Sequence, residues 1–528
     1  MASSSVSAYP RLSQAEKELA DDRYDAAAAH VLEHLRQRPG EARGLALLGR
    51  IALRTGALVQ AEQFLRQAMA TGLSGIDVQR DLASTINQQE RPGDALRAFE
   101  HLETIFDDPQ ITATRALILD KLGRNAQALP IHAALARANA DDPPYWIAYG
   151  HSLRAAGRID EAVSAYRAAT AADPERGEAW WAIANVKSDI LTEKDIAIME
   201  EMATVAVDLL NIVPLHFALG RAFHDRAEYQ RAFHHFAEGN RLRAGTLRYR
   251  PEELSSEIDQ FIREFGSEFF ERAAPEQPSV APVPVFLISL PRSGSTLLEQ
   301  MLDQHSQITA VGELPYIGAL LRSAMEIHIR RGPATLTQVI LGLGAEEKRK
   351  LGEDYLARTA LHKLGGAHYF IDKMPMNWSN VLFIRQILPQ AKFVEIRRNG
   401  MDCGLSNFVH YFSMAHPASF DLDHMGRFYL DYVRLMDHVD AAASGLIQHV
   451  RYEALVDDPR VQLRGVLDYL GLDWQPELLL FHESARVVRT PSAEQVRRPL
   501  NRQGIGAAKH YGRWLQPLRA ALGPLADT

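Results

Sequence analysis

Val283–Met301 reads VPVFLISLPRSGSTLLEQM and decides the fold of the second half of this 528-residue chain. Its first eight residues form a short apolar run suited to a buried strand, and its last residues follow a helical pattern. The loop between them would present backbone amides at a helix N-terminus, where the helix dipole favours a phosphate. The stretch therefore predicts a strand, an anion-binding loop and a helix.

The candidate anion-binding residues of this loop are Arg292, Ser293, Gly294, Ser295 and Thr296. Gly294 permits a backbone conformation that other residues resist, and the two residues after it add hydroxyl donors. The pattern G-x4-G-K-[ST] is absent, and the cation precedes the glycine, which argues against an ordinary ATPase or GTPase. On this segment alone, a Ser/Gly turn before a helix remains the alternative.

Further strands are expected at 308–313, 368–373, 392–397 and 449–455, separated by long helical patterns. Strands that alternate with helices predict a parallel sheet covered on both faces, a P-loop-like three-layer α/β domain over 283–520. Four prolines within residues 275–284 predict an extended linker. We assign 246–282 to a helical extension and this Pro-rich linker.

The first half of the chain repeats with a period of about 34 residues, the spacing of helical-hairpin arrays. One series of small residues comprises Gly49, Ala83, Ala116, Gly150, Ala184 and Gly220, and a second comprises Ala61, Ala95, Ala128, Ala162 and Ala232. A small residue on each helix lets the two backbones of a hairpin approach closely. The pattern predicts an α solenoid over 12–245.

This solenoid resembles the tetratricopeptide repeat, because Trp146-x2-Tyr149-Gly150 and the segment 157–166 match that signature. The match is weakest near Ile196. The resemblance implies a concave face that often holds a peptide or protein partner, and a pure scaffold is the alternative.

Composition excludes several classes of protein. The chain is 46% hydrophobic and 23% charged, and its net charge of −8 gives no general attraction to nucleic acid or to an anionic membrane. Cys403 is the single cysteine, and no leader-like start or apolar run of about 18 residues occurs. The sequence predicts a cytoplasmic protein. The histidine pairs 30/34 and 234/235 lack a third ligand, so no metal site is expected.

Arg398 stands at the end of an expected strand, and Ser406 follows eight residues later in a helix. A planar guanidinium and a hydroxyl together suit a second phosphate. Together with the first loop, they resemble the sulfotransferases that use 3′-phosphoadenosine 5′-phosphosulfate (PAPS), closest to the tyrosylprotein sulfotransferase branch and bacterial repeat-fused relatives. Residues 291–296 match that family's 5′-phosphosulfate loop, and Arg398 with Ser406 matches its 3′-phosphate site. The segments 450–456, 471–474 and 495–500 also match in order.

A hydroxyl acceptor must lose a proton, so a general base is expected near the loop. By resemblance, Glu313 aligns with the glutamate base of tyrosylprotein sulfotransferases, and His305 is its nearest rival. Lys373 is expected to stabilise the bridging oxygen as the sulfuryl group departs. Arg292 is expected to stabilise the charge that spreads during the transfer. Asp372 is expected to orient Lys373 or to cap the following segment.

The resemblance further implies that Tyr452 contacts the nucleotide, Ser492 lies near the sulfate and Arg497 meets the 3′-phosphate. The chain departs from the family at Asn399-Gly400, where relatives often have Asp-Pro, and at 501–508, which leaves the adenine contacts unassigned.

The leading interpretation is a PAPS-dependent sulfotransferase that needs no metal and acts on a hydroxyl of a peptide tyrosine, a glycan or a small molecule. A nucleotide kinase, an enzyme of another class, would require a Walker lysine and Mg²⁺ ligands, and the sequence shows neither. The non-enzymatic alternative is a silent nucleotide-binding domain on a repeat scaffold for protein–protein interaction.

Overall fold

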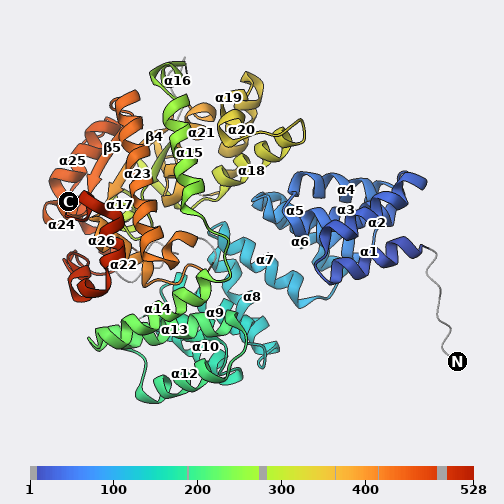
Figure 1. Cartoon of the computed structure of the whole chain (residues 1–528), viewed down its shortest axis with the longest axis horizontal. Helices are drawn as coiled ribbons and strands as arrows, with labels where there is room; N and C mark the ends of the chain where they lie inside the picture. Colours follow the sequence, from blue (N-terminus) through green and yellow to red (C-terminus); the bar gives the residue numbers. More distant parts are fainter. Residues whose placement is uncertain are drawn as a thin grey trace. The chain divides into compact units, whose positions relative to one another are not determined.

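The computed structural model describes residues 9–186, 189–272, 282–362, 364–413, 416–484 and 496–527. Helices fill the first half of the chain (Figure 1). They are α1 Pro10–Ala20, α2 Tyr24–Gln37, α3 Ala42–Thr55, α4 Leu58–Ala70, α5 Ile76–Gln88, α6 Pro92–Ile105, α7 Pro109–Lys121, α8 Asn125–Ala138, α9 Pro143–Ala155, α10 Ile159–Ala172, α11 Gly177–Ala184, α12 Glu193–Val205, α13 Leu209–Asp225, α14 Tyr229–Ala244, α15 Pro251–Glu264 and α16 Ser267–Arg272.

The small residues of the repeat lie where two helices approach most closely. A Cβ atom at Gly150 would stand 2.3 Å from Cε1 of Tyr166, and one at Gly220 would stand 2.6 Å from Cδ1 of Phe236. Each glycine therefore accepts an aromatic ring from the second helix of its own hairpin. The expected helical hairpins are confirmed.

A five-stranded parallel sheet follows, with the strand order β2-β3-β1-β4-β5. The strands are β1 Val283–Ile288, β2 Ile308–Gly312, β3 Tyr369–Asp372, β4 Lys392–Arg397 and β5 Ile447–Arg451. The helices are α17 Ser295–Leu302, α18 Tyr316–Ile329, α19 Leu336–Gly342, α20 Ala345–Thr359, α21 Val381–Ile387, α22 Gly400–Phe408, α23 Leu422–Ala442, α24 Tyr452–Asp457, α25 Pro459–Leu470 and α26 Gln516–Leu522, with 3-10 helices η1 Pro375–Asn380, η2 Pro417–Phe420, η3 Pro476–Glu483, η4 Ala507–Trp514 and η5 Gly523–Ala526.

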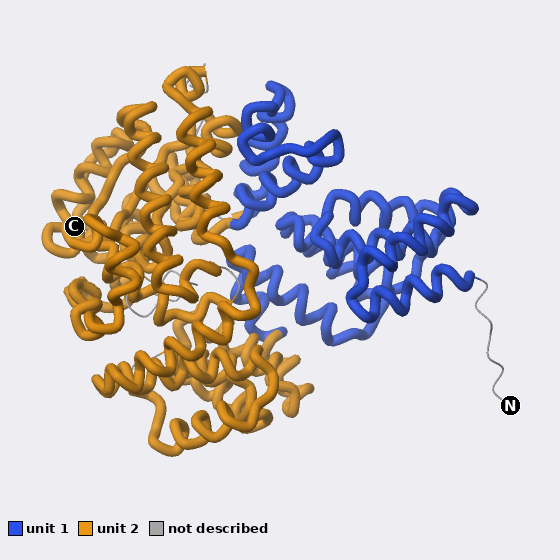
Figure 2. Tube along the Cα trace, in the orientation of Figure 1, with its two compact units in different colours: residues 1–131, 315–361 blue, residues 132–314, 362–528 orange. Residues whose placement is uncertain are grey.

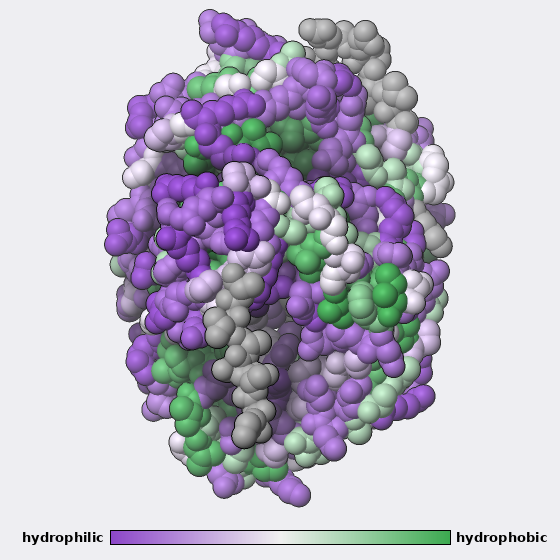
Figure 3. Space-filling view, turned by 90° about the vertical axis from the view of Figure 1, so that its right-hand side faces the viewer, coloured by the Kyte–Doolittle hydropathy of each residue, from purple (hydrophilic) through white to green (hydrophobic). Residues whose placement is uncertain are grey.

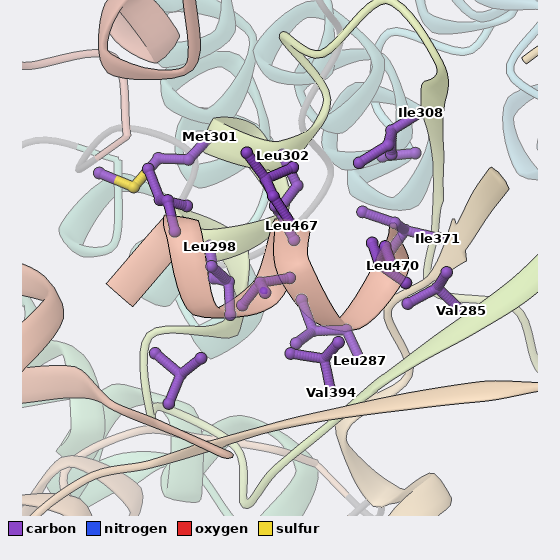
Figure 4. Packing of buried hydrophobic residues seen from close by; sticks show 14 of the residues in the cluster. Val285, Leu287, Leu298, Met301, Leu302, Ile308, Ile371, Val394, Leu467 and Leu470 are labelled. Carbon is purple, nitrogen blue, oxygen red and sulfur yellow. The ribbon is translucent and has the colours of Figure 1, made fainter. Parts of the chain in front are cut away.

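Helices cover both faces of this sheet. On one face, Leu298 of α17 and Leu467 of α25 pack against Leu287 and Val394 of the strands (Figure 4). On the other face, the buried ring of Trp378 lies 5.4 Å from that of Tyr432 in α23. The expected three-layer α/β architecture after the helical repeats is confirmed.

The last strand differs from its expected range of 449–455. It ends at Arg451, and α24 begins at Tyr452. The helix buries Leu455, which the strand pattern had placed in the sheet, together with the next residue, Val456. An apolar run of this length fits either element, so tertiary packing decides between them.

By internal contacts the chain forms two compact units, Met1–Ile131 with Pro315–Leu361 and His132–Leu314 with His362–Thr528 (Figure 2). In the first unit, the Glu326 carboxylate in α18 accepts hydrogen bonds from the amides of Val59 (2.9 Å) and Gln60 (2.8 Å) at the start of α4. An anion there suits the helix dipole. The sequence-based division into 12–245, 246–282 and 283–520 concerns repeat and motif content and stays a prediction.

The surface of the protein is mixed in character. On the face shown in Figure 3, hydrophilic residues predominate and hydrophobic residues form separate small groups. Among the helices of the described residues, none combines the length and apolarity that crossing a membrane requires.

Candidate functional site

The loop between β1 and α17 has two residues with left-handed backbone. Arg292 has φ +67° and Gly294 has φ +95°. Gly294 is the N-cap of α17, and the first-turn amides after it point out of the helix N-terminus. A Cβ at Gly294 would stand 2.3 Å from Cδ2 of Tyr452, so the tyrosine ring lies directly against the loop. Only glycine satisfies both the conformation and the close approach.

Helix α22 crosses this loop and contacts it with one face. Nε of Arg292 lies 3.4 Å from Oγ of Ser406, and Oγ of Ser293 lies 3.4 Å from Sγ of Cys403. The side-chain amide of Asn407 donates to the carbonyl of the loop's proline (2.8 Å). Sequence reasoning missed the roles of Cys403 and Asn407. Their spacing of four residues, which puts both on one helix face, was the available signal.

Arg398 reaches the loop from the end of β4. Its Nη1 donates to the carbonyl of Arg292 (2.8 Å), its Nη2 contacts the carbonyl of Gly504, and its guanidinium carbon lies 5.2 Å from the Tyr452 ring centre. Arg398 is 8% exposed, and its Nε is buried without a hydrogen-bond partner among the residues that the structure describes. A buried guanidinium with an unsatisfied donor is the chemistry that an anion would complete.

Glu313 and Lys373 meet at the ends of β2 and β3. The backbone amide of Lys373 donates to the carbonyl of Gly312 (2.9 Å), which ties the two strand ends together. The Lys373 ammonium, 1% exposed, forms an ion pair with the Glu313 carboxylate, which is 41% exposed. A buried charge of this kind needs such a partner. The pair therefore consists of one inner cation and one carboxylate open to solvent.

Two other candidates from the sequence, Asp372 and His305, interact with backbone groups. Asp372 is buried, and its carboxylate lies 3.4 Å from the amide of Leu314. The buried ring of His305 bonds through Nε2 to the carbonyl of Asp473 (2.9 Å), and its Nδ1 accepts from the amide of Gln307 (3.2 Å). Both ring nitrogens of His305 are thereby engaged, which favours Glu313 over His305 as the candidate base.

Strand order explains why these groups share one edge. The anion-binding loop follows β1, Lys373 follows its neighbour β3, and Arg398 follows its other neighbour β4. Carboxyl ends of parallel strands gather at a single edge, where open α/β sheets place their sites. The loop thus stands between an ion pair on one side and a cation on the other.

Positive charge accumulates around the loop. Loss of solvent and the neighbouring guanidinium of Arg398 lower the pKa of Arg292 to about 10. Like charges held together in a partly dry site destabilise each other, and an anion relieves that repulsion. Burial likewise raises the pKa of the Cys403 thiol, so that side chain remains a neutral packing group.

Two further candidates from the sequence are Ser492 and Arg497. Ser492 lies outside the described residues. The guanidinium of Arg497 lies against the repeats, because a Cβ at Gly157 would stand 2.3 Å from its Nη1. Its expected contact with a 3′-phosphate stays a prediction. The hydroxyl-bearing residues Ser295 and Thr296 are buried in the first turn of α17.

Asp402 organises the segment for which the sequence left the contacts unassigned. Its carboxylate accepts hydrogen bonds from the amides of Gly506 (2.6 Å) and Ala508 (2.9 Å). Beside it lies a cavity of about 480 Å³, whose lining includes the basic residues Arg451 and Lys509. No group of three or more His, Cys, Asp or Glu among the described residues could hold a metal ion.

Comparison with known proteins agrees with this geometry. Residues 284–476 match the model of the sulfotransferase family, and residues 143–186 match that of the tetratricopeptide repeat. The chain thus carries a sulfotransferase-family segment after tetratricopeptide repeats.

Two similar proteins cover different parts of the chain. An uncharacterized protein of Aquifex aeolicus (strain VF5) is 28% identical over 377 residues, which is 70% of this chain and 48% of that protein. Protein-tyrosine sulfotransferase 1 of Danio rerio is 25% identical over 236 residues, which is 42% of this chain and 64% of that protein. The chain thus matches less than two thirds of the length of either relative. A solved sulfotransferase domain from the curacin biosynthetic pathway is 17% identical, with a TM-score of 0.32, and the match covers 47% of this chain and 97% of that one.

Proposed function

We propose that this sulfotransferase-family chain transfers a sulfuryl group from PAPS to a hydroxyl acceptor by in-line displacement. The observation that carries the proposal is the arrangement of the loop between two flanking groups. Arg398 contacts it from the β4 side, and the Glu313–Lys373 ion pair stands at the end of the adjacent β3. The sequence-based expectation of a cytoplasmic location stays a prediction.

The donor fits the two cationic positions. In our proposal, Arg292 and the first-turn amides of α17 bind the 5′-phosphosulfate, and Arg398 with Ser406 binds the 3′-phosphate. The buried Nε of Arg398, which has no partner in the described part of the chain, would gain one from that phosphate. Tyr452, packed on Gly294 and beside Arg398, would line the nucleotide. ATP carries no 3′-phosphate and would leave Arg398 without an anion to neutralise.

The ion pair supplies a base for the acceptor hydroxyl and a cation for the leaving oxygen of the donor. The exposed carboxylate of Glu313 would accept the proton of the acceptor hydroxyl while the new O–S bond forms. Lys373 would turn from Glu313 to the oxygen that bridges phosphorus and sulfur as that S–O bond breaks. The products are the sulfated acceptor and 3′-phosphoadenosine 5′-phosphate (PAP). Catalysis then rests on positioning and charge stabilisation, as in phosphoryl transfer, without a metal.

The acceptor class remains broad. We propose a tyrosine hydroxyl of a peptide held by the repeats, with a glycan or a small metabolite as the other hydroxyl acceptors. The similarity to a protein-tyrosine sulfotransferase supports the first choice over 42% of this chain.

The test combines transfer with donor binding. Labelled sulfate from PAPS is followed, without added metal, over a panel of tyrosine peptides, glycans and phenols, with product masses. Glu313→Gln should lower the transfer rate about 10²–10⁴-fold, the usual contribution of a general base. Its affinity for PAP, measured by calorimetry, should stay within twofold of the wild type. Glu477→Gln, at an exposed glutamate of η3, is the matched control and should leave both values unchanged.

The outcomes separate the alternatives. Full transfer by Glu313→Gln would remove the base assignment. PAP binding by the wild type without transfer to any acceptor would favour the silent nucleotide-binding scaffold. Failure to bind PAP would reject the donor itself.

A further inference from the structure

The 3-10 helix η4, near the end of the chain, packs against the hairpin formed by α13 and α14. The hydroxyl of Tyr511 in η4 lies 2.7 Å from Nδ1 of His224 in α13, and the two rings are nearly parallel, at 4°. Beside this pair, the ring of His510 stacks on the ring of Tyr229 in α14, with 4.7 Å between their centres. Tyr511 is fully buried. Aromatic rings therefore hold η4 on both helices of the hairpin.

The hydrogen bond between Tyr511 and His224 joins two neutral groups. Burial raises the pKa of Tyr511 and lowers the pKa of His224. A neutral phenol donates through its single O–H, so Nδ1 of His224 is the acceptor. The hydroxyl of Tyr511 is thus the donor that ties η4 to α13.

The residues just before η4, which we call the bridging segment (504–508), contact the candidate donor site. The carbonyl of Gly504 accepts a hydrogen bond from Nη2 of Arg398. Two amides of the segment donate to the carboxylate of Asp402 in α22. The bridging segment therefore connects Arg398 to η4 along a few residues of the backbone.

Two backbone carbonyls determine how the guanidinium of Arg398 is oriented. Nη1 donates to the carbonyl of Arg292 in the anion-binding loop (2.8 Å), and Nη2 donates to that of Gly504. Because a guanidinium is planar and rigid, two fixed donors also fix the direction of the third nitrogen. That nitrogen, Nε, is buried and has no partner among the described residues. The position of the bridging segment therefore decides where Nε points.

The same hairpin also contacts the helix that carries Ser406. The side-chain amide of Asn240 in α14 donates to the carbonyl of Phe408 at the end of α22 (2.9 Å). Ser406, two residues earlier, lies 3.4 Å from Nε of Arg292. Both residues assigned to the 3′-phosphate are thus connected to α13–α14, one through the bridging segment and one through α22.

We propose, on the basis of the proposed function, that the hairpin α13–α14 is part of the donor site and that Tyr511 is a positioning residue for Arg398. Tyr511 holds the bridging segment on α13, and the bridging segment holds the guanidinium at the angle that the 3′-phosphate requires. Recognition of the 3′-phosphate then depends on the last helical hairpin before the sheet domain.

The test compares PAP with AMP, which lacks the 3′-phosphate, by calorimetry on the full chain. Tyr511→Phe keeps the ring and removes the donor. It should lower the ratio of PAP affinity to AMP affinity about three- to tenfold, the usual range for one hydrogen bond, with AMP affinity within twofold of the wild type. In the transfer assay, KM for PAPS should rise with little change in kcat, because the Glu313–Lys373 pair is untouched.

Tyr166→Phe is the matched control. The hydroxyl of Tyr166 in α10 lies 2.8 Å from Nδ1 of His151 in α9, and Tyr166 is likewise fully buried. This variant loses the same kind of bond in another hairpin, so it should lose stability in urea and keep the PAP-to-AMP ratio. A second variant, His510→Ala, removes an exposed ring that stacks on Tyr229 and should lower the ratio at least twofold without opening the core.

The outcomes separate this inference from the proposed function. Less than a threefold fall of the ratio in folded Tyr511→Phe, or an equal fall in Tyr166→Phe, would overturn the positioning role. If Tyr511→Phe does not fold, His510→Ala decides, and a ratio within twofold of the wild type would overturn it. Wild-type protein that fails to bind PAP, or that binds PAP and AMP equally, would instead reject the donor assignment of the proposed function.

Discussion

Replacing Gly294 by alanine tests the close contact between the loop and Tyr452. The new Cβ would stand 2.3 Å from Cδ2 and 2.9 Å from Cε2 of the ring, at a residue with φ +95°. Left-handed backbone costs an alanine about 1–2 kcal/mol. Overpacking against the ring adds about 1–3 kcal/mol. We therefore expect Gly294→Ala to lower the free energy of unfolding by about 2–5 kcal/mol.

Two further variants separate these contributions. Gly445 has φ +78° and no atom within 4 Å of the position that an added Cβ would take, so Gly445→Ala should cost only the backbone part, about 1–2 kcal/mol. In a Tyr452→Ala background, Gly294→Ala should likewise cost about 1–2 kcal/mol, because the ring is gone.

The assay is urea unfolding followed by tryptophan fluorescence. All six tryptophans lie in the unit His132–Leu314 with His362–Thr528, so the signal reports on that unit. Equal losses for Gly294→Ala and Gly445→Ala would refute the steric argument. PAP affinity, measured beside stability, should fall in Gly294→Ala and stay unchanged in Gly445→Ala.

Three other predictions concern separate parts of the chain. Arg398→Ala should weaken PAP binding about 10- to 100-fold and AMP binding little, which calorimetry would show, and unchanged discrimination would count against the 3′-phosphate site. The hydrogen bond to Glu395 raises the pKa of His449 to about 8. The stabilisation that the His449–Glu395 pair gives the folded state is therefore present below pH 6.5 and is lost as pH rises through about 8. Because the His449 side chain is 38% exposed, this stabilisation amounts to about 1 kcal/mol. Urea midpoints at pH 6 and 9 should differ less in His449→Gln, and an equal difference would contradict this. Glu326→Ala should destabilise the start of α4 by about 1 kcal/mol. The first amides of α4 should then exchange their hydrogens faster, and exchange at the wild-type rate would contradict the capping role of Glu326.

The helical repeats were predictable because their signal is local and recurs. Gly150 and Gly220 occupy equivalent repeat positions, and each accepts an aromatic ring from its partner helix. The strand–loop–helix around Gly294 was predictable for a similar reason, since its elements adjoin in the chain. The end of β5 was not predictable, because the residues after Arg451 are compatible with a strand or a helix and tertiary packing determines which one forms.

The candidate site was predictable only in part. Residue type and spacing pointed to Arg292 and Arg398, and the structure brings them into contact. The Glu313–Lys373 ion pair joins residues 60 positions apart, and the sequence named both without indicating that they meet.

The sequence by itself determined that this protein has helical repeats followed by a parallel-sheet domain with a phosphate-binding type of loop. The signals were composition, repeat period and motif spacing, which are properties of neighbours along the chain. The tertiary structure alone decided which side chains surround that loop. The crossovers of the sheet bring the ends of β1, β3 and β4 to one edge, and α22 carries contacts from that edge to the repeats. The contacts of α22 with Arg292 and Asn240 join residues more than a hundred positions apart, and over such a separation sequence spacing holds no geometric information.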